Sequence, residues 1–191
     1  MARSEKTSKL VLTALMLCLV LLATFSIRIP APFTQGYVHL GDTFIFVSVL
    51  LLGKKHGAVA AGFGSAMADI LGGFAMYAPW TLIIKFIMAY IMGIFVEIST
   101  KRKKNLVKIA GVPIIQIIGM FIAGIIMVAG YAVVDGAFAG NMLAGMLGIP
   151  FNIIQFATGI VLALLIIATL YKTPAKKMFA YRIDNIELRR I

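Results

Sequence analysis

Long apolar stretches separated by short polar or basic segments dominate the pattern of this 191-residue chain. A helix needs about 20 apolar residues to cross the hydrocarbon core of a bilayer. The pattern predicts an all-α integral membrane protein with six transmembrane helices, at Leu10–Ile27, Gly41–Leu52, Ala58–Leu71, Trp80–Ile98, Ile109–Val134 and Pro150–Tyr171. We expect one membrane domain over residues 1–172 and a basic cytoplasmic or interfacial tail over residues 173–191.

The second and third predicted helices are short, with only 12 and 14 residues. At about 1.5 Å per residue they reach roughly 20 Å, against a hydrocarbon core of about 30 Å. They either extend into their flanking loops or stop short and leave a depression. A loop rich in turn formers, Arg28–Leu40, precedes them and includes Pro30, Pro32 and Gly36.

Composition supports the membrane class, because 61% of the residues are hydrophobic and only 13% are charged, against about 25% charged in soluble domains. The net charge is +11, and 16 of the 18 basic residues fall before the first helix, between the second and third, between the fourth and fifth, and after the sixth, which puts them all on one side of the membrane; the exceptions are Arg28 and Lys85. This positive-inside pattern places both termini in the cytoplasm of a plasma-membrane protein. The basic loops therefore face anionic lipid, and nucleic-acid binding is not expected.

Two ionisable residues lie at membrane depth near the outer side. Asp69 lies two residues before the end of the third predicted helix, and Lys85 lies five residues into the fourth. The short linker Gly72–Pro79 makes these helices antiparallel neighbours, so the two side chains could meet. Such residues usually mark a site or pathway, although the pair could also be an ion pair that only holds two helices together.

Other polar and aromatic residues are expected at the same outer level. Asn152 and Gln155 share one helix face, and either contact a ligand or join helices. Tyr77 and Trp80 either flank the mouth of a site or anchor the chain at the membrane interface. His39 lies beside them, and Asp42 is interpreted as a helix N-cap rather than a ligand contact. The candidate substrate-binding residues are Asp69, Lys85, Asn152, Gln155, Tyr77, Trp80 and His39.

Several kinds of chemistry find no support in the sequence. It contains no HExxH, phosphate-loop or Ser/His motif, so no enzyme activity and no cofactor are expected. The two histidines lie on opposite sides of the membrane, so no metal site is expected. Small residues Ala14 and Cys18, four apart on the first helix, suggest a surface for docking a partner helix.

Four segments carry a resemblance to a known family: His39-Leu40-Gly41-Asp42, Gly53-Lys54-Lys55-His56-Gly57-Ala58, Gly64-Ser65-Ala66-Met67-Ala68-Asp69 with Gly72-Gly73, and Ala78-Pro79-Trp80-Thr81-Leu82-Ile83-Ile84-Lys85. Over residues 8–172 the chain resembles substrate-binding S components of energy-coupling factor (ECF) vitamin transporters, of the riboflavin and hydroxymethylpyrimidine type.

That resemblance implies six helices around a ligand pocket near the outer face, covered by the first outer loop. It also implies a complex with a transmembrane coupling protein and two cytoplasmic ATPases, in which the subunit topples to deliver its ligand. The family's AxxxA motif falls on Ala14 and Cys18, with cysteine replacing the second alanine.

The polar groups favour a flat heteroaromatic ligand that donates and accepts hydrogen bonds, such as hydroxymethylpyrimidine or pyridoxine. Riboflavin or another vitamin is the alternative within this class. A stand-alone facilitator or channel, a membrane enzyme using Asp69 and Lys85, and a ligand-free assembly subunit are the alternatives from other classes.

Overall fold

The computed structural model describes residues 2–31, 36–101, 107–170 and 172–173. Its helices are α1 (Ala2–Ser26), α2 (Gly41–Gly72), α3 (Ala78–Lys101), α4 (Ile114–Phe138), α5 (Met142–Leu147) and α6 (Ile149–Leu170). The predicted tail, 173–191, lies outside the described residues except for Thr173. Within the described residues, five helical stretches are long and apolar enough to cross a membrane, and the last of them combines α5 and α6.

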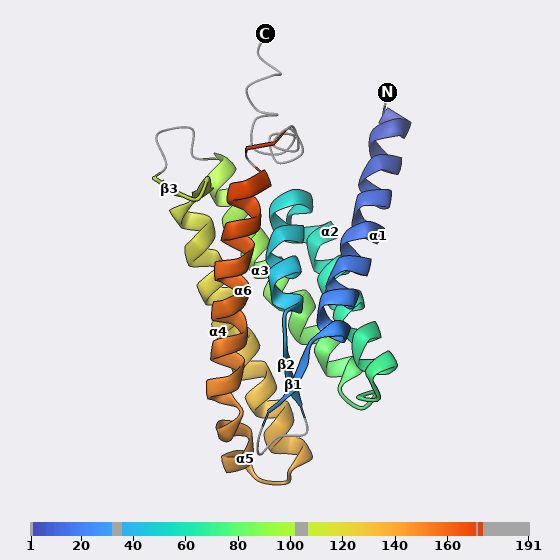
Figure 1. Ribbon diagram of the computed structural model, residues 1–191, viewed down its shortest axis with the longest axis vertical. Coiled ribbons are helices and arrows are strands. Elements are labelled where there is room, and N and C mark those ends of the chain that lie inside the picture. The colour runs from blue at the N-terminus through green and yellow to red at the C-terminus, as the bar shows by residue number, and fades with distance from the viewer. Residues whose placement is uncertain (1, 32–35, 102–106, 171, 174–191) are drawn as a thin grey trace.

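Helix α2 contains both the second and the third predicted helices, which meet at the single non-helical residue Gly53. The chain reverses inside α2 at Gly53, where φ is 72° and ψ is −175°. A Cβ on Gly57 would lie 2.8 Å from the Cα of Val49, although residues eight apart in a straight helix are separated by about 12 Å. The two halves of α2 are therefore antiparallel neighbours, as Figure 1 shows. Glycine suits this turn because positive φ is unfavourable for other residues.

Small residues let the second half of α2 pack closely against α1 and α3. A Cβ on Gly64 would lie 2.7 Å from the backbone oxygen of Leu17 in α1, and one on Gly62 would lie 3.0 Å from that of Leu82 in α3. Both glycines are buried. The small face of this segment is therefore used for packing inside the molecule.

Two short antiparallel hairpins interrupt the helical architecture, and the all-α prediction did not include them. Strands β1 (Arg28–Pro30) and β2 (Tyr37–His39) pair with Ile29 opposite Val38. Strands β3 (Lys108–Ile109) and β4 (Val112–Pro113) turn through Ala110 and Gly111, both at positive φ. Helix α4 therefore begins at Ile114, five residues later than the fifth predicted helix.

The two ends of the molecule differ in what they carry. In Figure 1 the start of α1, the end of α6 and β3 lie at one end, whereas the strands β1 and β2 and helix α5 lie toward the other. Between them, fully buried methionines from α3 and α4 fill the interior: Met88, Met92, Met120 and Met127. A polar cavity lies on the β1–β2 side of this apolar core.

Candidate functional site

A cavity lies where β2, the end of α2, the start of α3, the end of α4 and the start of α6 meet. It encloses about 480 Å³ of atom-free space, including its opening. Among the described residues its wall consists of Ala31, Gly36, Tyr37, Val38, His39, Asp69, Phe74, Tyr77, Thr81, Tyr131, Asp135, Gly148, Asn152 and Gln155. Five of the seven predicted binding residues line this one cavity: His39, Asp69, Tyr77, Asn152 and Gln155.

Asp69, near the end of α2, is a buried carboxylate with one unused oxygen. The Tyr37 hydroxyl donates a 2.7 Å hydrogen bond to its Oδ1, whereas its Oδ2 has no partner among the described residues. The side chain is only 5% exposed. Burial and the neighbouring Asp69 carboxylate raise the pKa of Tyr37, so that hydroxyl remains a hydrogen-bond donor.

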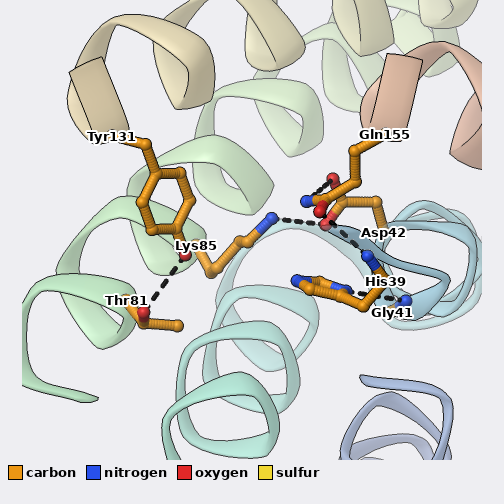
Figure 2. Close-up of polar contacts among 7 residues, drawn as sticks. All are labelled: His39, Gly41, Asp42, Thr81, Lys85, Tyr131 and Gln155. Atoms are coloured by element: carbon orange, nitrogen blue, oxygen red, sulfur yellow. Dashed lines mark hydrogen bonds and ion pairs between the residues drawn. The ribbon is translucent and has the colours of Figure 1, made fainter. Parts of the chain in front are cut away.

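Lys85 and Asp42 form a fully buried ion pair behind the cavity wall, with both side chains 0% exposed. In Figure 2 the Lys85 ammonium points at Asp42, and Gln155 approaches the same carboxylate from α6. The Gln155 amide donates to Asp42 Oδ2 over 3.0 Å, and its carbonyl accepts from the His39 backbone over 3.1 Å. This network ties α3, α6 and β2 to the first turn of α2.

Two predictions about these charged residues are wrong. Lys85 pairs with Asp42, not with Asp69, because the first turn of α2 lies beside it and Tyr37 occupies Asp69. Asp42 is not an N-cap, since Leu40 holds that position without a side-chain cap and Asp42 already lies within the helix. Lys85 is also absent from the cavity wall, so it supports the site from behind.

His39 is a buried, neutral side chain in the cavity wall. Its Nδ1 accepts a 3.0 Å hydrogen bond from the Gly41 backbone, which leaves the proton on Nε2. Burial, reinforced by the charge of Lys85, lowers the pKa of His39 to about 3. The imidazole therefore adds no charge at neutral pH.

Helix α4 contributes two wall residues that the sequence reasoning missed. The Tyr77 hydroxyl donates to Asp135 Oδ1 over 2.8 Å, and the Tyr131 hydroxyl donates to Thr81 over 3.1 Å. Asp135 follows the predicted helix Ile109–Val134 directly, and the structure places it inside α4. The signal available was its acidic side chain at the end of an otherwise apolar run.

Trp80 does not belong to the cavity. It is 47% exposed and absent from the wall, so it faces the surroundings of the helices, where an aromatic residue suits a membrane interface. Its prediction as a site residue is therefore not supported by the geometry. Tyr77, three residues earlier, is instead buried in the wall.

On α1, Ala14 and Cys18 are both exposed, while Met16 and Val20 of the same helix are buried. The docking role predicted for Ala14 and Cys18 stays a prediction. No group of three or more potential metal ligands occurs within the described ranges.

A family model and two similar proteins match most of this chain. The profile of the family described as "ECF-type riboflavin transporter, S component" matches residues 4–172. A Pyrococcus woesei protein described as "Uncharacterized protein in gap 3'region" is 34% identical over 144 residues, which cover 75% of this chain and 88% of that protein. The Lactococcus lactis subsp. cremoris protein "Thiamine precursor transporter HmpT" is 28% identical over 161 residues, covering 84% of this chain and 86% of that protein.

A solved structure of similar fold is described by the words "Structure and mechanism of the S component of a bacterial ECF transporter". Its TM-score is 0.64 at 18% sequence identity, and the match covers 87% of this chain and 97% of that one. At that identity the likeness concerns the fold.

Proposed function

The chain belongs to the S-component family of ECF transporters, and from this premise we propose that it is the high-affinity capture subunit for a small heteroaromatic vitamin or precursor. Hydroxymethylpyrimidine or a pyridoxine-like compound is the favoured ligand. Because the family consists of transport subunits, the expectation that the chain is not an enzyme is confirmed.

The observation that carries this proposal is the polar cavity, in which one oxygen of Asp69 has no donor among the described residues. The cavity opens to the surroundings, and its atom-free space of about 480 Å³ includes that opening. Its wall combines carboxylates, amides and tyrosine hydroxyls with the rings of Phe74 and three tyrosines. The aromatic rings can stack on a planar heterocycle, while the polar groups can form hydrogen bonds with the nitrogen and oxygen atoms at its edge.

A single-ring ligand fits these features better than riboflavin, which remains the alternative. Most of the lining residues carry a polar group, whereas a three-ring ligand needs a longer apolar surface. The relative named as a thiamine precursor transporter supports a pyrimidine, since the pyrimidine half of thiamine derives from hydroxymethylpyrimidine.

We place the chain in the plasma membrane with six spans and both termini in the cytoplasm. The reversal of α2 at Gly53 divides that helix into two segments that can each cross the membrane, and with six spans 16 of the 18 basic residues fall on the same side as the two termini. The exposed Ala14 and Cys18 of α1 then form the docking surface for a transmembrane coupling protein, which acts with two cytoplasmic ATPases. A cysteine is still small enough for close helix contact.

A stand-alone facilitator is less consistent with the interior. Passive transport needs a polar path across the bilayer, but the buried methionines of α3 and α4 fill the space beyond the cavity. The chain therefore captures a ligand at one side and needs a partner to release it at the other.

Reconstitution in liposomes tests this proposal. The protein alone should bind radiolabelled hydroxymethylpyrimidine without net flux, and uptake should require the coupling protein, the ATPases and ATP. A matched Ala14→Leu variant should still bind the ligand but lose ATP-dependent uptake. Flux through the protein alone at a rate unaffected by ATP would contradict the proposal.

A further inference from the structure

The cavity wall has two carboxylates and no basic side chain among the described lining residues. Asp69 comes from α2 and Asp135 from α4. Residues 32–35, whose sequence is Pro-Phe-Thr-Gln, contain no basic side chain either. A ligand in this space therefore meets negative charge that the wall itself does not balance.

The basic side chains of Lys85 and Arg28, which lie near the cavity, interact with groups outside its wall. Lys85 is paired with Asp42 behind the wall, as Figure 2 shows. Arg28 donates to the Gly72 carbonyl over 3.0 Å, with its guanidinium 4.6 Å from the centre of the Phe25 ring. Neither cation lines the cavity, and His39 is neutral because its pKa lies at about 3.

The two carboxylates differ in how far their hydrogen-bonding capacity is used. Tyr37 and Tyr77 each donate to one oxygen, on Asp69 and Asp135 respectively. Among the described residues no donor forms a hydrogen bond with Asp69 Oδ2, although the Thr81 hydroxyl lies close to this carboxylate and the side chain is only 5% exposed. A buried acceptor without a donor is destabilising, so a ligand that brings a donor to this oxygen gains affinity.

We propose that Asp69 selects the ligand: its Oδ2 accepts a hydrogen bond from an N–H group of a neutral or cationic heteroaromatic ring, and the acidic wall excludes the phosphate ester of the same ring. The inference rests on the proposed capture function and adds the charge class of the ligand. Phosphate brings negative charge close to Asp69 and Asp135. At an effective dielectric constant of ~20, each pair of unit charges ~6 Å apart weakens binding about 100-fold.

Calorimetric titration of the purified full-length protein in detergent, at neutral pH, tests the inference with matched pairs. The pairs are hydroxymethylpyrimidine, pyridoxine and riboflavin, each with its own phosphate monoester. Wild type is compared with Asp69→Asn and Asp69→Glu. Glu97→Gln is the control, because it removes one acid from the Lys54–Glu97 ion pair, which lies apart from the cavity wall.

Whichever of the three unphosphorylated compounds binds, we expect the affinity of wild type for it to exceed the affinity for its phosphate ester by at least about 100-fold. Asp69→Asn should weaken binding of the free base about 10- to 100-fold, since a hydrogen bond to a charged group is lost, and should narrow the preference over the ester. Asp69→Glu keeps the charge but moves the oxygen, so it should lose affinity for the free base yet still exclude the ester. Glu97→Gln should match wild type.

Equal affinity of wild type for a base and its ester would overturn the inference and leave the capture function standing. The same holds if folded Asp69→Asn and Asp69→Glu both bind the free base as wild type does. If Asp69→Asn does not fold, as judged by the loss of its cooperative thermal transition, two measurements still test the inference. These are the preference of wild type for the free compound over its ester and the affinities of Asp69→Glu for both. Failure of every compound to bind would overturn the capture function and the inference together.

Discussion

Replacing Lys85 with methionine should destabilise the protein strongly, because it leaves Asp42 as a buried carboxylate without its cation. Both side chains of the pair are 0% exposed, and of the described residues only Gln155 would still donate to Asp42. Removing one partner of a buried pair costs about 3–5 kcal/mol. For a chain of this size, at about 2–4 °C per kcal/mol, the thermal midpoint should fall by roughly 6–20 °C.

The assay is thermal unfolding in detergent, followed by intrinsic fluorescence. Lys54→Met is the matched control, because its ion pair with Glu97 is partly exposed, at 25% and 44% of the side chains, and should contribute at most about 1 kcal/mol. The double variant Asp42→Asn with Lys85→Met should recover much of the loss, since the uncompensated charge is gone. Asparagine is chosen because it keeps the shape of the aspartate side chain where Gly159 packs closely against Asp42.

Two outcomes would refute this reasoning. A thermal midpoint for Lys85→Met close to that of Lys54→Met would show that the pair contributes little. A double variant as unstable as Lys85→Met alone would show that the loss comes from the missing lysine side chain rather than from an unpaired Asp42.

The remaining predictions concern the cavity wall. Tyr37→Phe removes the hydrogen bond to Asp69 Oδ1 and should weaken ligand binding by about 3- to 10-fold, as for one ordinary hydrogen bond; unchanged affinity by calorimetry would contradict it. The folded pKa of His39, about 3, lies below the ordinary 6.5, so its contribution to stability is present above pH ~6.5 and lost as pH falls toward 3. At pH ~5 the loss should reach about 2 kcal/mol relative to His39→Asn, and parallel pH–stability curves for the two proteins would argue against it. Trp80→Phe should leave affinity within about 2-fold, because Trp80 is exposed and outside the wall; a larger loss in titration would return Trp80 to the site.

The sequence predicted correctly which polar residues lie together at one end of the helices. Polar residues are rare in an apolar chain, so each of them is a strong indication of a site. Asp69, Asn152 and Gln155 were placed together from helix length and direction alone, and they line one cavity. The family was also recognised correctly from short segments between residues 39 and 85. Periodicity and charge placement depend on local sequence, so the helices and their direction can be predicted without knowledge of the packing.

Pairing between side chains could not be predicted, because it depends on which helix faces lie together. Lys85 is compatible with either Asp42 or Asp69 by depth, and only the packing of the first half of α2 decides for Asp42. Tyr37 was overlooked since its loop showed only turn formers, whereas a three-residue strand directs it to Asp69. The same limit explains Asp42, whose position just after a glycine resembled a cap.

Mass spectrometry of small molecules that co-purify with the protein tests the central claim most directly. Protein purified from cells grown in rich medium, extracted after denaturation, should release one heteroaromatic vitamin or precursor in near-stoichiometric amount. The same compound should be depleted from the Asp69→Asn variant and retained by Glu97→Gln. Recovery of only lipid, or of an acidic or peptidic compound in place of a heteroaromatic ring, would contradict the account.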